Sequence, residues 1–226
     1  MALVNTLEGA RLAPQATIGI LGAGRVGTAI ARLALAAGYR VKLATSKPAE
    51  ENSLIIEIVT PGAEAVDASE AAAADLVIVA IPLHKFKDLD SHALSGKIVV
   101  DAMNYWSATD GEIPDFVNTA LTSSEVVAAF LSASHVLKSF NHIGYHEMEP
   151  DALPAATGER RALAIAGDNS AAKTVLRGFI EHIGFDAVDA GDLAAGRHFE
   201  PGSEIFNGRF NASELNELLH AVRIPN

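Results

Sequence analysis

The residues that most clearly carry chemistry form a glycine-rich loop near the start of the chain. The loop has the pattern G-x-G-x-x-G and consists of Gly22, Ala23, Gly24, Arg25, Val26 and Gly27. It directly follows an apolar run, residues 17–21, and opens a segment with helical periodicity. In such a unit the first glycine permits a tight turn, the second lets a pyrophosphate approach the backbone, and the third lets the helix pack on the sheet. The loop therefore predicts dinucleotide binding at free helix N–H groups, with Arg25 adding charge at the rim; the alternative is a structural turn without a ligand.

The end of the next apolar run indicates which dinucleotide would bind. NAD-binding proteins usually carry Asp or Glu about 20 residues beyond the loop, where the carboxylate holds the ribose 2′-hydroxyl. Here that position is occupied by Thr45, Ser46 and Lys47, with no acid. Two hydroxyls and an ammonium suit a 2′-phosphate, whereas a carboxylate would repel it. The segment favours NADP, unless Lys47 is simply a solvated residue at the start of a helix.

Further candidates follow the other apolar runs, because ligands bind outside the carboxyl ends of parallel strands. Pro82 and Leu83 are expected beneath the path of the ribose and nicotinamide, and Asn104 could bind a ribose or an amide. Tyr105 and Trp106 could stack on a flat ring, or could equally pack in the core or a lid. The predicted cofactor contacts at these strand ends are Ala80, Ile81, Pro82, Ala102 and Asn104.

Other site chemistry has little support. His142 and His146 are spaced like a metal pair and Glu147 follows, but the HExxH pattern is absent and Gly144 interrupts the segment. We expect no metal. No G-x-S-x-G elbow is present, so a hydrolase is not expected. The sequence assigns no catalytic residue.

The pattern of elements predicts an α/β fold with a doubly wound parallel sheet. Short apolar runs alternate with amphipathic stretches. Strands are expected at 17–21, 40–45, 65–68, 75–81, 97–101, 135–140, 161–166 and 185–188. Helices are expected at 26–37, 48–59, 69–74, 84–94, 114–121, 124–131, 169–183 and 211–221, the last capped by Asn211 or Ser213, and residues 197–210 as a loop or hairpin. A boundary between two domains is expected within residues 140–154.

The composition of the chain excludes several classes of protein. With 226 residues and 49% hydrophobic residues, the chain can bury a core. A net charge of −11 argues against a nucleic-acid partner, and the absence of cysteine excludes disulfides, thiolate metal sites and thiol nucleophiles. No segment reaches the ~20 apolar residues of a membrane helix, and residues 1–16 do not resemble a signal peptide. We expect a cytoplasmic protein without a membrane partner.

Several segments, taken together and in order, resemble one family. They are GAGRVG, the TSK that ends the second run, DLVIVAIP, KIVVDAMN, HVLKSFNHIG and DAGDLAAGR. This set, spanning about residues 17–197, resembles the F420-dependent NADP oxidoreductases, also called NADPH-dependent F420 reductases. The cytosolic domain of the STEAP ferric reductases is similar.

The resemblance implies a Rossmann domain followed by a small C-terminal α+β domain, often as a homodimer. We expect an N-terminal extension at 1–16. The resemblance implies an NADP-binding domain at 17–145 and, at 146–226, a domain that forms the acceptor cleft. It also implies that Asn141, His142 and Gly144 line the nicotinamide and acceptor side. Hydride would pass between nicotinamide and a deazaflavin, coenzyme F420, or a flavin-like acceptor; this step needs proximity and ring alignment rather than a strong acid–base pair.

Two other functions remain open from the sequence. One is a reductase of an unidentified small molecule, such as a β-hydroxyacid or an imine. The other is a non-enzymatic NADP(H) sensor or regulator, for which the glycine loop is equally suitable.

Overall fold

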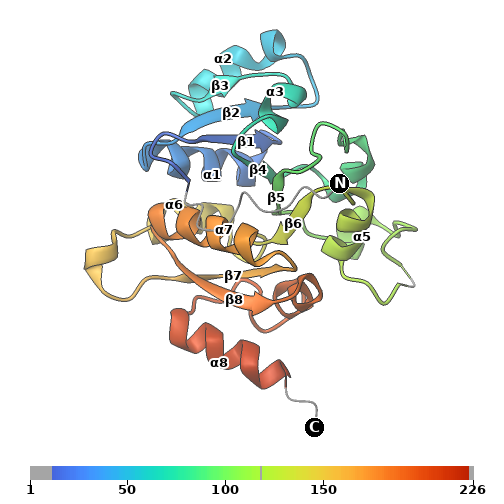
Figure 1. Cartoon of the computed structure of the whole chain (residues 1–226), viewed down its shortest axis with the longest axis vertical. Helices are drawn as coiled ribbons and strands as arrows, with labels where there is room; N and C mark the ends of the chain where they lie inside the picture. The colour runs from blue at the N-terminus through green and yellow to red at the C-terminus, as the bar shows by residue number, and fades with distance from the viewer. Residues whose placement is uncertain (1–11, 118, 224–226) are drawn as a thin grey trace, which may run out of the picture.

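A computed structural model describes residues 12–117 and 119–223, and it is organised around one sheet. The sheet has eight strands in the order β3-β2-β1-β4-β5-β6-β7-β8. Figure 1 shows this order running from β3 near the top to β8 near the bottom, with α8 beyond β8. All neighbouring strands are parallel except β6 and β7, which are antiparallel. The predicted α/β class with a doubly wound sheet is confirmed.

The elements have the following bounds. The strands are β1 Thr17–Leu21, β2 Arg40–Ala44, β3 Glu64–Ala65, β4 Leu76–Val79, β5 Ile98–Asp101, β6 His135–Lys138, β7 Ala162–Gly167 and β8 Asp186–Gly191. The α-helices are α1 Arg25–Ala36, α2 Ala49–Val59, α3 Ala68–Ala72, α4 Ser107–Asp110, α5 Ser123–Phe130, α6 Tyr145–Asp151, α7 Ser170–His182 and α8 Ala212–Arg223. The 3-10 helices are η1 Leu83–Asp88, η2 Ala155–Thr157 and η3 Leu193–Phe199.

The core lies on both faces of the sheet, because alternate residues of each strand point to opposite sides. On one face Ile18, Ile20 and Leu43 pack beneath α1, α2 and α7. On the other face Val77 and Val79 pack beneath α3, η1 and α5. Near the far edge, α8 and η3 cover β7 and β8 with their own apolar cluster. Strands with apolar residues on both faces explain why the sequence shows unbroken apolar runs.

The C-terminal strands continue the same sheet. The expected boundary between residues 145 and 146 falls at the start of α6, and β7 then pairs with β6 through Leu137–Gly167 and Lys138–Ala166. The division into two domains therefore stays a prediction, while the strands on either side of it are hydrogen-bonded to each other.

Two expected helices differ from the structure. The segment expected as a helix at 84–94 is a 3-10 helix only as far as Asp88, with turns at 91–96, and the helix expected at 114–121 is absent from its described residues. The described residues of 114–121 form turns rather than a helix. The N–H groups of Phe116 and Val117 both bond to the carbonyl of Ile113, which closes a single turn. The hydroxyl of Thr119 then accepts the N–H of Leu121 at 3.1 Å, so a side chain competes with helix formation. The segment serves instead to pack Phe116 against the aromatic rings of neighbouring elements.

The C-terminal tail is a loop rather than a hairpin. Residues 200–211 contain turns and bends, and α8 begins after Asn211. The Asn211 side chain accepts the N–H of Glu214 at 3.0 Å, and the Glu214 carboxylate accepts the N–H of Asn211 at 2.9 Å. Of the two predicted caps, Asn211 is therefore the one used, in a reciprocal capping arrangement.

Candidate functional site

The glycine loop lies between the end of β1 and the start of α1, at the carboxyl edge of the sheet. Gly22 has φ +117°, and a Cβ there would lie 2.3 Å from the Ala80 carbonyl oxygen. A Cβ on Gly27 would lie 1.9 Å from the Gly22 carbonyl oxygen. A Cβ on Gly24 would meet nothing within 4 Å. Two glycines are thus demanded by the packing of the fold, and the third leaves open space over the loop, where a ligand can approach the backbone.

A cavity of about 480 Å³ opens beside this loop, within the range usual for small-molecule sites. Of the predicted cofactor contacts, it brings together eight: Gly22, Ala23, Gly24, Thr45, Ser46, Ala80, Ile81 and Pro82. Its remaining lining consists of Leu21, Ala44, Ala68, Ala72, Lys85, Asp88, Leu89, Asp90 and Leu94. The small side chains of α3 leave a mainly apolar wall, as a stacked base requires.

Lys47 lies outside the lining of this cavity. Its side chain is 65% exposed, and its ammonium is 3.6 Å from the Glu51 carboxylate on α2. The Thr45 hydroxyl accepts the Lys47 N–H at 3.0 Å and so shapes the turn at the end of β2. Lys47 can reach a ligand only from the solvent side, whereas Ser46 lines the cavity directly.

Lys85 was not among the predicted contacts, yet it is the cation that lines the cavity. It lies on η1, three residues beyond Pro82. The signal was available, because a charged residue that closely follows the carboxyl end of a parallel strand lies near the ligand edge of the sheet. Asp88 and Asp90 line the same region and were also missed; Asp90 is engaged by the N–H groups of His92 and Ala93.

The predicted nicotinamide side centres on two asparagines that are hydrogen-bonded to each other. Asn104 donates to the Asn141 carbonyl at 2.7 Å, and Asn141 donates to the Asn104 side-chain oxygen at 3.1 Å and to the Phe199 carbonyl at 2.9 Å. Asn104 is partly exposed and keeps one further N–H for a ligand, while Asn141 is buried. Ala102, two residues before Asn104, is buried.

His142 supports this pair from inside the molecule. It is 2% exposed, and its Nε2 accepts the N–H of Ala164 at 3.0 Å. The proton must then be on Nδ1, which lies 3.3 Å from the Asn141 side-chain oxygen. Burial lowers the pKa of His142 to about 3, with the positive charges of Arg161 and Lys138 adding to the effect. His142 is therefore neutral near pH 7 and holds Asn141 in place.

Gly144 marks the start of α6, where aromatic and charged groups gather. Its N–H donates to the Glu147 carboxylate at 3.1 Å. Tyr145, next to it, accepts from Arg25 at 3.2 Å, and the Arg25 guanidinium lies 5.3 Å from the centroid of the Tyr145 ring. Arg25 thus connects the glycine loop to α6 across the edge of the sheet.

The two aromatic residues after Asn104 have different surroundings. The Tyr105 hydroxyl donates to the Gly111 carbonyl at 2.9 Å, and its ring packs on Phe116, so Tyr105 serves packing. Trp106 is 44% exposed and meets Phe206 edge to face, with ring centroids 5.2 Å apart. The tail also bonds to this region, because the Asn207 N–H donates to the His142 carbonyl.

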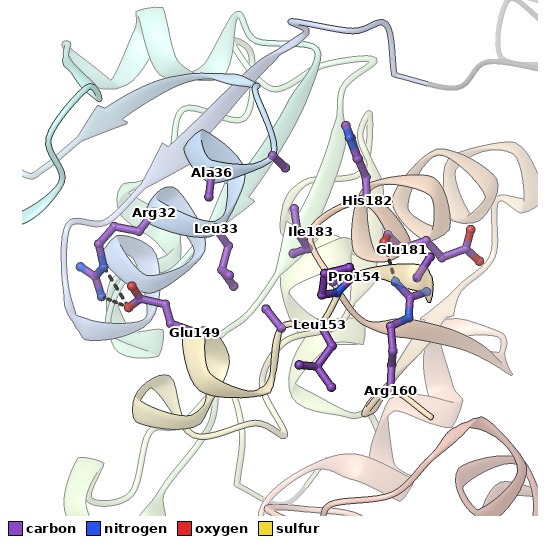
Figure 2. A pocket seen from close by; sticks show the side chains of 14 residues that line it. Arg32, Leu33, Ala36, Glu149, Leu153, Pro154, Arg160, Glu181, His182 and Ile183 are labelled. Atoms are coloured by element: carbon purple, nitrogen blue, oxygen red, sulfur yellow. Dashed lines mark hydrogen bonds and ion pairs between the residues drawn. The ribbon is translucent and has the colours of Figure 1, made fainter. Parts of the chain in front are cut away.

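A second cavity, of about 560 Å³, lies among α1, α6 and the end of α7 (Figure 2). Arg32 forms an ion pair with Glu149 at 2.6 Å, and Arg160 donates to the Glu181 carbonyl at 2.9 Å. Its cations thus already have partners within the protein, and no predicted site residue lines it. We do not assign the functional site to this cavity.

Two further structural findings bear on the class of protein. The described residues contain no group of three or more His, Cys, Asp or Glu that could hold a metal ion. In the same part of the chain, no helix combines the length and apolar character needed to cross a membrane.

Comparison with known proteins supports the family resemblance. The family model described as NADP oxidoreductase, coenzyme F420-dependent, matches residues 17–105. This segment runs from β1 to the residue after Asn104 and so contains the glycine loop and the whole 480 Å³ cavity. No curated protein sequence matches the chain.

Solved structures share the fold over most of the chain. A hypothetical protein of Sinorhizobium meliloti is 27% identical, with a TM-score of 0.75, over 87% of this chain and 95% of its own. A candidate F420-dependent NADP reductase of Arthrobacter is 23% identical, with a TM-score of 0.67, over 80% and 87%. A reductive aminase of Aspergillus terreus, solved with NADPH and ethyl levulinate, is 18% identical, with a TM-score of 0.54, over 81% of this chain and 58% of its own. The predicted resemblance is confirmed, and these findings support an NADP-dependent oxidoreductase of Rossmann type.

Proposed function

We propose that this protein transfers hydride between NADP(H) and a flat acceptor of the deazaflavin type, coenzyme F420, or of a flavin-like type. One observation carries the proposal furthest. The 480 Å³ cavity joins an open glycine, Gly24, to the end of β2, and that strand end supplies Ser46 and no carboxylate. A phosphorylated ribose fits that chemistry, whereas a free 2′-hydroxyl would have no acidic partner at the end of β2, the usual place for one.

The residues present fit the cofactor along the whole edge of the sheet. Under this proposal the pyrophosphate binds the N–H groups of the glycine loop, where α1 has no acidic residue in its first turn. Ser46 and Lys85 contact the 2′-phosphate from inside the cavity, and Lys47 approaches it from solvent. The partly exposed Asn104 receives the nicotinamide or its ribose.

On the acceptor side, the proposal places Trp106 against the flat ring. The exposed indole of Trp106 offers a face for a flat ring, and Phe206 meets it edge to face. Asn141 and Gly144 hold the adjacent backbone. Such an arrangement can align two flat rings, which is most of what hydride transfer requires.

When bound, NADPH supplies two electrons and a proton as hydride. The chain's own groups supply position rather than acid–base chemistry. His142 is the histidine nearest to Asn141, but it is buried and its pKa of about 3 leaves no proton to donate near pH 7. Any further proton for the reduced acceptor would come from solvent.

The test is NADPH oxidation by the purified protein with coenzyme F420, FMN and a quinone supplied separately. NADH serves as the control donor, and Gly24→Ala as the matched variant because its added Cβ meets no protein atom. We expect turnover with F420 or FMN, preference for NADPH, and loss of turnover in the variant. Saturable NADPH binding without turnover on any acceptor would overturn the reductase and favour a sensor or an unidentified substrate. Absence of NADPH binding would overturn the cofactor assignment.

A further inference from the structure

An ion pair lies fully buried behind the predicted nicotinamide side. Lys138, at the end of β6, and Asp101, at the end of β5, both have side chains with 0% exposure, and their charged atoms are 3.3 Å apart. Burying two charges costs several kcal/mol per ion, and replacing such a pair by apolar residues is often neutral or stabilising. A buried pair is therefore weak evidence for stability, and its contacts point to another role.

Both members of the pair form hydrogen bonds to the backbone of one residue, Met103, in the loop after β5. One oxygen of Asp101 accepts the N–H of Met103 at 2.8 Å, while Lys138 donates to the Met103 carbonyl at 2.5 Å. The other oxygen of Asp101 accepts the hydroxyl of Ser124, on α5, at 2.6 Å. The peptide groups on both sides of Met103 are thus fixed by the two opposite charges.

The next residue is Asn104, whose side chain bonds twice to Asn141. Asn141 in turn follows Lys138 by three residues at the end of β6. The same two strand ends are therefore joined twice, once by the buried charges and once by the amides of the buried Asn141 and the partly exposed Asn104. Fixing the Met103 backbone leaves the Asn104 side chain little freedom except toward Asn141 and the ligand edge.

We infer that Asp101 and Lys138 are positioning residues, which set Asn104 in the orientation that binds the nicotinamide half of NADP(H). The inference rests on the proposed function, which puts the nicotinamide beside Asn104. Lys138 itself is sealed from the ligand and acts only through the loop.

The test compares two ligands that share the adenosine half. NADPH carries the nicotinamide, whereas 2′,5′-ADP lacks it, so the ratio of their dissociation constants reports the nicotinamide contacts alone. The variant is the double substitution Asp101→Asn with Lys138→Met, which removes both charges and keeps an acceptor for the Met103 N–H. We call the ratio of the 2′,5′-ADP dissociation constant to the NADPH dissociation constant the NADPH advantage. In the variant we expect the affinity for 2′,5′-ADP to change less than twofold and the NADPH advantage to fall about fivefold to tenfold, the size of one hydrogen bond.

A double-mutant cycle then separates positioning from stability. Asn104→Ala should lower the NADPH advantage in the native background and have no further effect in the pair variant, because residues that act as a unit are not additive. Equal losses in both backgrounds, or an unchanged advantage in the pair variant, would overturn the inference. If the native protein binds 2′,5′-ADP but gains nothing from the nicotinamide, the proposed site itself is wrong.

Two controls complete the design. Lys173→Met with Asp189→Asn removes a pair between α7 and β8, whose ammonium is 2.8 Å from its carboxylate. It should leave both ligand affinities unchanged. If the pair variant does not fold, Ser124→Ala removes one bond to Asp101 and keeps both charges. It should lower the NADPH advantage by a smaller factor, and no change would count against the inference.

Discussion

At the scale of single residues, the fold changes the chemistry of His142 most. Its sequence context imitates a metal pair, yet both ring nitrogens face protein partners and the ring packs edge to face on Phe199. The same imidazole that looks reactive in the sequence is a neutral support for Asn141. The pKa of His142, however, reports how completely its ring is shielded from water.

The stability of the protein should depend on this titration. The folded pKa of His142 is about 3, below the ordinary value of 6.5, so below pH 6.5 the unfolded chain takes a proton that the folded chain refuses. The contribution of neutral His142 to the free energy of unfolding is complete above pH 6.5 and is lost progressively as the pH falls toward 3. From about pH 7 to about pH 5, the native protein should lose about 2 kcal/mol more unfolding free energy than His142→Gln, measured with denaturant. Parallel curves for the two proteins would contradict the burial of this ring.

Cofactor choice is also a property of single side chains. Lys47→Glu should weaken NADPH binding about tenfold while NADH binding holds or rises, because a carboxylate there repels a 2′-phosphate. Equal loss for both cofactors in fluorescence titrations would exclude the end of β2 as the 2′-phosphate site.

Lys85 should have an effect of the same kind. Lys85→Gln removes a cation from the cavity lining and should weaken NADPH binding about tenfold, with little change for NADH. Lys87→Gln is the matched control on the same helix, since Lys87 pairs with Asp115 at 2.6 Å and does not line the cavity. A loss confined to the Lys87 variant would reverse our placement of the cationic site.

At the scale of elements, β1, the glycine loop and α1 form the unit on which the site depends. Its packing allows two glycines to be separated by experiment. Gly27→Ala forces a Cβ to 1.9 Å from the Gly22 carbonyl and should cost about 1–3 kcal/mol of unfolding free energy. Gly24→Ala should leave stability nearly unchanged and weaken NADPH binding strongly, because its Cβ enters only the open space over the loop. A Gly24 variant that binds NADPH normally would show that the pyrophosphate lies elsewhere.

This unit was predictable because local and tertiary signals agree there. The apolar run, the glycine spacing and the helical periodicity all specify one strand–turn–helix, and the structure has it at Thr17–Leu21 and Arg25–Ala36. The prediction of a helix at 114–121 was wrong because it depended on a periodic pattern alone, without a cap or a packing partner. Local hydrogen bonds to the Thr119 hydroxyl and the Ile113 carbonyl form there instead of a helix.

The candidate site residues also divide into those that local sequence predicts and those that depend on tertiary contacts. Side chains directly at strand ends, such as Ser46, Pro82 and Asn104, could be identified from the order of the elements alone. Lys85 required the path of η1 across the edge of the sheet, which one sequence does not specify. The pairing of Asp101 with Lys138 required the knowledge that β5 and β6 are neighbours, because 37 residues separate the two in the chain.

At the scale of the whole molecule, the C-terminal tail is tied to the site by Arg161. This residue is buried just before β7 and donates to the Gly208 carbonyl at 2.6 Å, to Asp151 at 2.8 Å and to Glu147 at 3.1 Å. Burial acts to raise the pKa of Glu147, but the hydrogen bond and charge of Arg161 outweigh it, and the pKa lies below its ordinary value. One guanidinium therefore joins α6 to the tail that also bonds to His142.

Arg161→Met should release this tail and destabilise the fold. It leaves the buried Asp151 paired with Arg209 alone, at 2.8 Å, and removes the bonds from Arg161, so we expect a loss of about 1–3 kcal/mol of unfolding free energy. Amide hydrogen exchange should rise at residues 199–210, and the pKa of His142 should move up toward 6.5 because one of the charges that lower it is gone.

The neighbouring Arg160 provides the control, since the two side chains have different partners. Arg160 pairs with Asp186 at 2.7 Å and donates to the Glu181 carbonyl, away from the tail. Arg160→Met should cost less stability and leave exchange at 199–210 unchanged, because Asp186 is partly exposed and can be solvated. If both variants loosened the tail equally, the effect would be a general loss of stability. If only Arg161→Met does so, and NADPH binding weakens with it, the tail belongs to the wall of the site as well as to the edge of the sheet.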